Sequence, residues 1–557
     1  MSSFSPSSSG KSRVTRRMFF GAAAGVAAAS AQSPQASNEG QREHRAFRIR
    51  VDAAILERDA PQPDHATNGD EEQFATKIGN YSKGLPHNSL GEVDTKAYAA
   101  FQSALMNGAH QSDLDQVPMG AAGGTVQRKF VDPCSGVCFD LQGADSHHLA
   151  IPPAPGVVSA EAAGEAVELY WQALLRDVPF AQYDSDPLAQ AAAAELSKLS
   201  DFRGPRVNGA VTTGTLFRGY TYGDTVGPYI SQFLVRPVAF GAQYYEQRMR
   251  TGVPGLDYGT DYNEWLSLQN GSTPAKTFAY DSNRPFIRNG RDIAQWVHMD
   301  VLYQAYFNAM LIMMDPPDPT DSITGGGMGI PYNPGNPYLN ARTQEGFGTF
   351  GPPGIAAALA EIASRALKGV WYQKWMVHRR LRPEAFGGLV HNTLTTAAGK
   401  YALHKDVLSS SAVQRVKQKY GTYLLPLAFP EGSPLHPSYG AGHATVAGAC
   451  VTILKAFFDD TAPIVNPVTP SADGSTLAPY TGADAGQMTV GGELNKVAAN
   501  VAIGRNFAGI HYRADYAESL KLGEQIAISV LRDQRMTYVQ EFNGFTFTRF
   551  DGTRITV

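Results

Sequence analysis

Long apolar segments with a helical period are the feature of this chain that most restricts its fold. In each segment apolar residues recur at spacings of three and four, which places them on one face of an α-helix. The expected helices cover residues 159–175, 187–199, 291–314, 355–382, 444–458, 494–503 and 516–536. The segment 291–314 has little polarity on any face, so we expect it to be central. The sequence therefore predicts a mainly α fold, a helical bundle with long surface loops.

Polar or Pro- and Gly-rich stretches separate these segments. Residues 32–90 are polar and rich in Asn, Asp, Gly and Pro, and predict an irregular arm that extends over the surface or a neighbouring subunit. Residues 315–354 hold clusters of Pro and Gly and predict a loop whose length is typical of a functional or disordered segment. Residues 545–557 alternate on both sides of Asp551-Gly552, which predicts a β-hairpin. We expect an arm with loops over 32–150 and a helical domain over 151–557.

The first 31 residues have the features of a twin-arginine export signal. Arg16-Arg17 precedes an Ala-rich apolar run over 19–29, and Ala29-Ser30-Ala31 is a small-x-small cleavage site. The alternative is a disordered basic tail, but the three features occur in the order that a signal requires. We expect cleavage after Ala31 and export to the periplasm or outside the cell.

The charge balance argues against some partners. The chain has a formal net charge of −4, and its first 31 residues carry four cations and no acids, so the exported chain is more negative by four. An acidic surface does not favour nucleic acid or anionic lipid. No stretch approaches the roughly 20 unbroken apolar residues of a bilayer span. We expect no nucleic-acid partner and no membrane span.

The chain has three cysteines. Cys134 and Cys138 are four residues apart, and an oxidising compartment permits a disulfide between them. Two free thiols are the alternative. Cys450 lies in an apolar run and is expected to be a small buried hydrophobic residue.

Cationic and imidazole side chains are concentrated in residues 371–383. Lys374, His378 and Arg382 are spaced by four residues, so on a helix they share one face. Such a face is costly unless it meets an anion, and the alternative is an ordinary solvated basic face. The neighbouring Trp371 and Trp375 indicate partial burial, which favours an anion site.

A glycine-rich turn, Gly440-Ala441-Gly442, comes just before the helix expected over 444–458. This arrangement leaves free backbone N–H groups at the positive end of a helix, where oxyanions bind. His436 and His443 lie on either side of the turn. Taken alone, the pattern is most often only a turn.

The segment 504–515 adds an arginine, a histidine and an acid. Arg505 can offer a planar fork of donors to an oxyanion. Asp515 follows His511 by four residues, so it can orient the imidazole ring and fix its tautomer. Taken alone, this pattern is typical of a surface loop. Together, the three segments predict one site between residues 371 and 515 for a tetrahedral or trigonal-bipyramidal oxyanion, with phosphate and vanadate as the candidates.

These motifs resemble those of the vanadium haloperoxidase and acid phosphatase superfamily. The residues that carry the resemblance are Lys374, Arg382-Pro383, Gly442-His443, Arg505, His511 and Asp515. The sequence around them is similar to the algal bromoperoxidase branch, notably in Trp371-Tyr-Gln-Lys374-Trp375, Glu431-Gly-Ser-Pro-Leu-His436-Pro437 and Gly509-Ile-His511-Tyr-Arg513. The resemblance covers essentially the whole chain after the signal.

The resemblance implies a vanadate cofactor, hydrogen peroxide and halide as substrates, and a homo-oligomer. By position, it assigns the binding of vanadate oxygens to Lys374, Arg382, Arg505 and the backbone N–H of Gly442. It implies that His511 binds vanadium axially and that His443 is the acid–base residue. His436 matches a further histidine of the bromoperoxidase branch.

Ala441 departs from the family pattern, which usually has a serine before the Gly-His pair. The family's serine hydroxyl contacts an oxygen of the vanadate or of bound peroxide. Its absence leaves the anion cage intact but puts the halide range and the activation of peroxide in question. A phosphatase that uses the same cage and a non-catalytic oxyanion-binding protein are the alternatives to a haloperoxidase.

Overall fold

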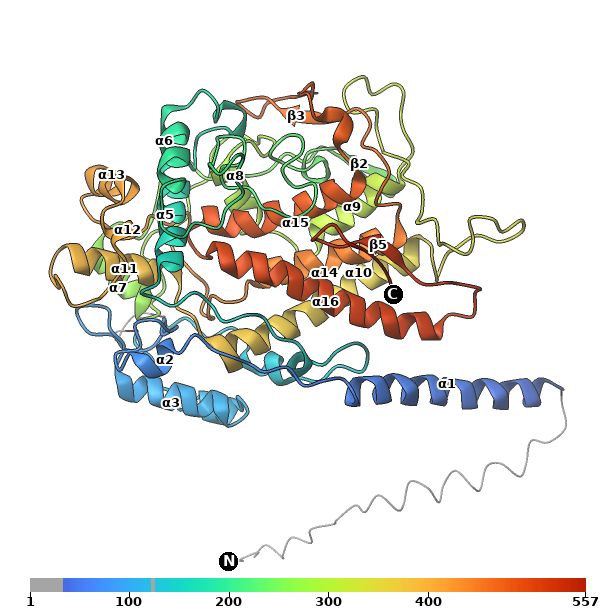
Figure 1. The fold of residues 1–557 in the computed structure, drawn as a ribbon, viewed down its shortest axis with the longest axis horizontal. Coiled ribbons are helices and arrows are strands. Elements are labelled where there is room, and N and C mark those ends of the chain that lie inside the picture. The colour runs from blue at the N-terminus through green and yellow to red at the C-terminus, as the bar shows by residue number, and fades with distance from the viewer. Residues whose placement is uncertain (1–33, 122–125) are drawn as a thin grey trace, which may run out of the picture. The chain divides into compact units, whose positions relative to one another are not determined.

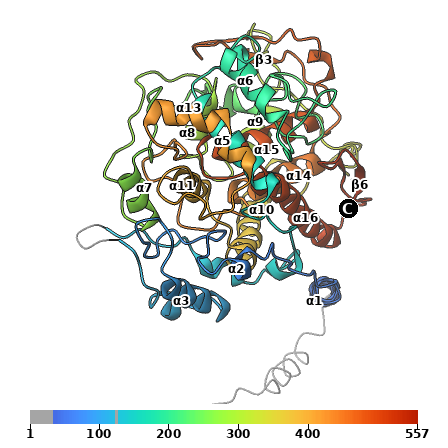
Figure 2. The same ribbon diagram turned by 60° about the vertical axis from the view of Figure 1, so that its left-hand side comes forward.

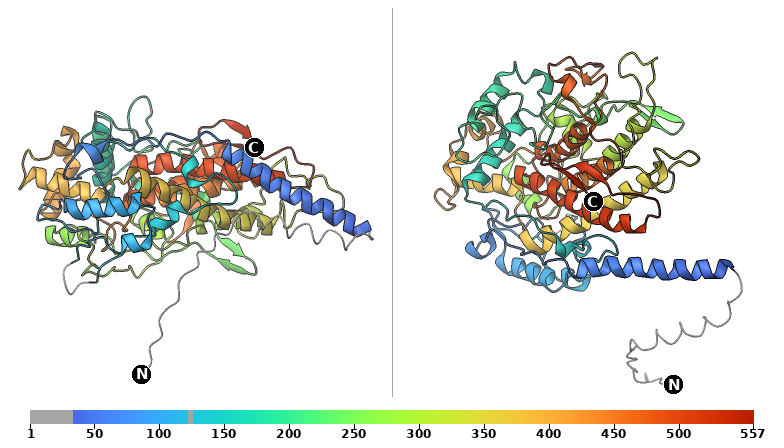
Figure 3. Two further views of the ribbon diagram at one scale, coloured as in Figure 1. Left: turned by 90° about the horizontal axis from the view of Figure 1, so that it is seen from below. Right: turned by 45° about the vertical axis from the view of Figure 1, so that its right-hand side comes forward.

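The computed structural model describes residues 34–121 and 126–557 of the chain. The signal expected over residues 1–31 lies outside the described residues. The chain divides into two units, Met1–Ala60 and Pro61–Val557. The first contains the helix α1 (Pro34–Arg58), drawn in blue in Figure 3, and all functional residues discussed below lie in the second. The domain boundaries expected at residues 31 and 150 stay predictions.

The second unit is mainly helical. Its α-helices are α2 (Asp70–Gln73), α3 (Thr95–Met106), α4 (Gln111–Leu114), α5 (Ala160–Leu174), α6 (Pro187–Leu196), α7 (Tyr262–Gln269), α8 (Gly290–Trp296), α9 (Gln304–Met314), α10 (Pro352–Tyr372), α11 (Pro383–Leu394), α12 (Lys405–Leu408), α13 (Ser411–Tyr420), α14 (Gly442–Phe457), α15 (Val490–Phe507) and α16 (Arg513–Thr537). Short 3-10 turns are η1 (Pro133–Val137), η2 (Ser146–His148), η3 (Phe180–Gln182), η4 (Gln232–Leu234) and η6 (Ala485–Gln487), and η5 (Gln373–His378) is π-helical. The mainly α fold expected from the helical period is confirmed.

Helix α14 is the centre of the bundle. It packs against α10, α15 and α16, and Figures 1 and 2 show these four helices together from two sides. Nearly all of α14 is buried, as its apolar composition requires. Glycines allow the closest approach, because a Cβ at Gly448 would lie 2.2 Å from the carbonyl oxygen of Leu520, and one at Gly523 would lie 2.1 Å from that of Thr445. The backbones of α14 and α16 are therefore in direct contact.

Three antiparallel two-stranded hairpins complete the described elements: β1 (Val238–Phe240) with β2 (Gln243–Tyr245), β3 (Val468–Pro470) with β4 (Leu477–Pro479), and β5 (Thr546–Thr548) with β6 (Arg554–Thr556). The C-terminal hairpin expected around Asp551-Gly552 is confirmed, with Phe547 opposite Ile555. Gly552 has φ 84°, a backbone conformation that glycine adopts readily. The expected long loop is also present, since residues 315–351 form no helix and only isolated β-bridges.

The irregular arm expected over residues 32–90 is wrong in its first part. Residues 34–58 form α1, because Ala, Arg, Gln and Glu favour a helix there. The turn-forming residues that suggested an irregular arm are concentrated after Arg58, in the segment 60–69.

Two expected helices are interrupted. The helix expected over 291–314 is divided into α8 and α9 by residues 297–303, and the helix expected over 355–382 ends as an α-helix at Tyr372. Pro383 does not only end a helix: it is the first residue of α11, where its fixed φ and missing N–H cost nothing. Both interruptions place side chains in the site described below.

Three further expectations concern the cysteines and a membrane span. Cys134 and Cys138 are free thiols in this structure, and the Cys134 thiol donates to the carbonyl oxygen of Ala109, so the expected disulfide is absent among the described residues. Cys450 is buried, as expected. No described helix is long and apolar enough to cross a membrane.

Candidate active site

Lys374 is positioned by the π-helical turn η5. The wider turn continues α10 and ends at Arg379, whose φ of 40° stops the helix. Lys374 is fully buried, and its Nζ donates to the carbonyl oxygens of Pro437 (2.7 Å) and Ser438 (3.0 Å). π-Helical turns occur frequently at functional sites, because they displace side chains from the regular helical face.

His378 does not share the environment of Lys374, so the single helical face expected for Lys374, His378 and Arg382 is wrong. The π-helical turn and the left-handed Arg379 break the spacing of four. The ring of His378 lies 4.9 Å from the ring of Tyr439 in an edge-on arrangement. Burial, helped by His65 and Arg379, lowers the pKa of His378 to about 3, which leaves it a neutral buried side chain.

Arg382 lies at the N-terminus of α11 and holds two histidines. Its Nη1 donates to the carbonyl oxygen of Ile510 (2.8 Å) and lies 3.0 Å from His511 Nε2, while its Nη2 lies 2.9 Å from His436 Nδ1. Its Nε donates to the carbonyl oxygen of His436. Burial lowers the pKa of Arg382 to about 10.

Arg505 and the start of α14 carry unused donors. Arg505 Nη1 donates to the carbonyl oxygen of Val297 (2.9 Å), but its buried Nε has no partner among the described residues. Burial lowers the pKa of Arg505 to about 10. Helix α14 begins at Gly442, and no side chain caps its N-terminus. Both features favour an anion, which can accept hydrogen bonds from free N–H groups.

Lys374, Arg382 and Arg505, here called the cage cations, are buried without a carboxylate. Among the described residues none of the three forms an ion pair. Other buried arginines nearby are paired: Arg379 with Glu71, Arg380 with Glu165 and Asp515, and Arg513 with Glu168. A buried charge without a partner costs several kcal/mol. The missing negative charge is therefore expected to come from a bound anion.

The pKa values of the buried cations differ in the same way between those with and those without a carboxylate partner. Burial, with the neighbouring Arg382 next in effect, lowers the pKa of Lys374 well below its usual value. For Arg380 the penalty of burial is exceeded by the attraction of Glu165 and Asp515, which raises its pKa. An anion bound by the cage cations would reverse the lowering in the same way.

His511 presents a lone pair to this group. Its Nδ1 lies 2.9 Å from Asp515 Oδ2, so Nδ1 carries the proton, and the lone pair of Nε2 faces Arg382 Nη1 at 3.0 Å. Burial, followed by Arg382 and Lys374, lowers the pKa of His511 well below its usual value. A neutral imidazole oriented by a carboxylate is typical of a metal ligand. The expected contact between His511 and Asp515 is confirmed.

His443 is the most accessible of the expected site residues. Its side chain is 22% exposed, and its Nε2 lies 3.2 Å from Asp300 Oδ1. His436 is buried, with its ring centre 4.8 Å from that of Trp371. Ala441 is the N-cap residue of α14 and has no side chain that could cap the helix. The structure thus brings the expected cations and His436, His443 and His511 to one place, while their individual roles stay predictions.

Sequence reasoning missed the groups that support these side chains. Asp300 lies in the break between α8 and α9 and reaches His443. Asp515 also accepts hydrogen bonds from Arg380 and Ser438. The second terminal nitrogen of Arg380 donates to Glu165 on α5. Arg380 lies within the basic segment and could have been singled out there, but Asp300 and Glu165 show no spacing that links them to the site.

Comparison with known proteins identifies the family. Residues 357–540 match the model of the VCPO second helical-bundle domain. The chain is 36% identical to a vanadium-dependent bromoperoxidase of Corallina pilulifera, covering 86% of this chain and 91% of the relative. It is also 36% identical to one of Ascophyllum nodosum, covering 94% and 93%.

A solved structure gives the same result for the fold. The homohexameric structure of the second vanadate-dependent bromoperoxidase from Ascophyllum nodosum superposes with a TM-score of 0.85 and 30% identity, covering 100% of this chain and 94% of that one. Both the overall sequence and the fold agree with the resemblance carried by the motifs. The chain therefore belongs to the family of the vanadium-dependent bromoperoxidases.

Proposed function

We propose that this chain is a haloperoxidase that holds vanadate and uses hydrogen peroxide to oxidise iodide and, more slowly, bromide. In the overall reaction halide, hydrogen peroxide and a proton give hypohalous acid and water. The observation that carries the proposal is the set of three buried cage cations without a carboxylate, beside the lone pair of a neutral His511.

The side chains fit vanadate. The cage cations and the backbone N–H of Gly442 would hold its oxygens, and Arg505 Nε is a buried donor still without a partner among the described residues. His511 Nε2 would bind vanadium. Once bound, vanadate supplies a Lewis acid that activates hydrogen peroxide. The fixed donors favour the negative charge that develops on oxygen during the reaction.

His443 and Asp300 provide a route for the proton. When His443 Nε2 donates to Asp300 Oδ1, its Nδ1 has the free lone pair and can accept a proton from hydrogen peroxide. Asp300 stabilises the positive charge that the ring then acquires. Because the His443 side chain is partly exposed, it can exchange protons with solvent.

Reconstitution separates this proposal from its alternatives. We expect protein stripped of vanadate to oxidise no halide, and to recover with vanadate but not with iron or heme. Phosphate should compete, since the same cage suits both oxyanions. The measurement is the rate of iodide oxidation at increasing vanadate, with and without phosphate. Phosphate ester hydrolysis without any peroxidase activity would support a phosphatase, and neither activity would support a binding protein.

We propose that the chain is exported by the twin-arginine route to the periplasm or outside the cell. Arg16-Arg17, the apolar run and the cleavage site support this. We expect the exported protein to begin near Gln32 and the change of Arg16 and Arg17 to lysine to leave it in the cytoplasm. Cell fractionation and N-terminal sequencing measure both, with lysine at Arg13 as the control. Undiminished export after the double change would contradict the proposal.

A homo-oligomer is the assembly that we propose for this chain. The related Ascophyllum nodosum protein is described as a homohexamer. Phe139 and Leu141, two residues apart, are 81% and 101% exposed. Large exposed apolar patches are typical of surfaces that contact another protein.

A further inference from the structure

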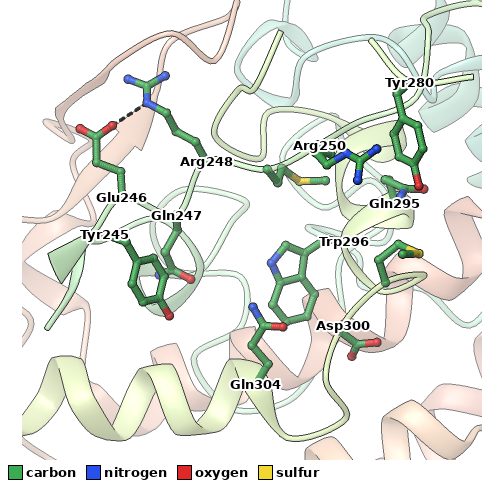
Figure 4. Close-up of a pocket in the computed structure, with 12 residues that line it drawn as sticks. Tyr245, Glu246, Gln247, Arg248, Arg250, Tyr280, Gln295, Trp296, Asp300 and Gln304 are labelled. Atoms are coloured by element: carbon green, nitrogen blue, oxygen red, sulfur yellow. Dashed lines mark hydrogen bonds and ion pairs between the residues drawn. The ribbon is translucent and has the colours of Figure 1, made fainter. Parts of the chain in front are cut away.

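A pocket of about 230 Å³ adjoins the site through Asp300 (Figure 4). It is formed by residues 245–250, at the end of β2 and just after it, by Tyr280, and by residues between 295 and 304, where α8 ends and α9 begins. Asp300 lines the pocket and also contacts His443 Nε2 at 3.2 Å. A molecule held here would therefore lie next to the place where we propose that hypohalous acid forms.

One side of the pocket suits an aromatic ring. Trp296 and Tyr280 line it, together with the thioethers of Met249 and Met299. Met299 is 63% exposed and Tyr280 is 38% exposed, so part of each side chain is accessible. Aromatic rings pack favourably against aromatic faces and against the sulfur of methionine.

The pocket also contains a guanidinium without a matching acid. Arg250 lies over the ring of Tyr280, 4.0 Å from its centre, and forms no ion pair with a described residue. Arg248, two residues earlier, is paired with Glu246 at 2.6 Å. In the view of Figure 4 the ring of Trp296 lies between Arg250 and Asp300. Arg250 is thus free to bind a carboxylate while an aromatic ring packs on Trp296.

We propose that this pocket binds a small aromatic acid with an electron-rich ring, such as a phenol that carries a carboxylate side chain, and that this compound is the organic acceptor of the halogen. The inference rests on the proposed function, which supplies the hypohalous acid. A ring C–H bond is replaced by a carbon–halogen bond, and the proton combines with the hydroxide of the hypohalous acid to give water. Arg250 would hold the carboxylate and Trp296 would hold the ring.

Binding can be measured without turnover. The probes are 4-hydroxyphenylacetate and its neutral amide, titrated calorimetrically into the vanadate-loaded full chain without peroxide or halide. We expect the acid to bind about tenfold more tightly than the amide, because only the acid offers a carboxylate to Arg250. Equal binding of the two probes, or binding of neither, would overturn the proposal.

Matched variants locate the binding. We expect Arg250→Gln to weaken binding of the acid about tenfold and to leave the amide unchanged. Arg248→Gln is the control, because the Arg248 guanidinium is already paired with Glu246. We expect this change to have little effect on the affinity for either probe. Trp296→Leu should weaken both probes. An equal effect of the two arginine changes would also overturn the proposal.

A competition during turnover tests the acceptor role. The acid and the amide are supplied together at equal low concentrations, and the ratio of brominated acid to brominated amide is measured. We expect this ratio to be higher with the enzyme than with added hypobromite. In Arg250→Gln we expect the ratio to fall to the value obtained with hypobromite. The same ratio in all three cases would overturn the acceptor role. If the enzyme oxidises no halide although the acid binds, the proposed function fails while the pocket assignment stands.

Discussion

Replacing His511 with alanine is expected to abolish vanadate binding and halide oxidation. The chain offers His511 Nε2 as a lone pair oriented by Asp515, and the cage cations can supply only donors. Removing groups that merely orient a metal ligand costs about ten- to a hundredfold in affinity or activity, so loss of the ligand itself should exceed a hundredfold. Vanadate retained per chain after gel filtration and the rate of iodide oxidation measure the effect.

His378→Ala is the matched control for that experiment. Both histidines are buried and both have a lowered pKa, but His378 contacts Tyr439 and not the cage cations. We expect the control to retain vanadate and activity, with circular dichroism showing that both variants are folded. Full activity in His511→Ala would refute the assignment of His511 as the vanadium ligand.

The helical period predicted the bundle well, because the apolar residues that form the buried face of a helix are close together in the sequence. The central α14 and the C-terminal α16 agree with their expected ranges to within a few residues. The interruptions were not predictable in this way. Residues 297–303 leave the helical path where Val297 accepts from Arg505 and Asp300 reaches His443, and both contacts join segments far apart in the sequence.

The candidate site shows the same limit. Lys374, Arg382 and Arg505 are revealed by the motifs around them, because cations and glycines cluster within short segments. The supporting groups are not revealed: Asp300 precedes His443 by more than a hundred residues, and Glu165 is one of several acids on α5. The spacing of four that suggested one face for Lys374 and His378 failed, because a π-helical turn cannot be recognised from an apolar period.

Restoring a hydroxyl at residue 441 is expected to shift the halide preference towards bromide. Ala441 is the N-cap of α14, where a serine side chain would lie beside the free N–H groups at the start of the helix. A hydroxyl there can donate to an oxygen of the activated peroxide and make it a stronger electrophile. Bromide is harder to oxidise than iodide, so it gains more from this activation.

The structure removes one possible substitute for the missing hydroxyl. Ser438 donates to Asp515 Oδ2, which commits its hydroxyl to the support of His511. Ser438 cannot replace the family's serine without losing its contact with Asp515. We therefore expect this chain to oxidise iodide well, bromide weakly and chloride not at all.

The test compares Ala441→Ser with the parent chain on iodide and bromide. A hydrogen bond to a charged partner contributes about 1.5–3 kcal/mol, which corresponds to roughly tenfold to a hundredfold in rate if it acts in the transition state alone. We expect the ratio of bromide to iodide turnover to rise by up to this amount. Ala441→Val is the control, because it adds volume without a hydroxyl and should not raise the ratio. An unchanged ratio in the serine variant would show that the absent hydroxyl does not set the halide preference.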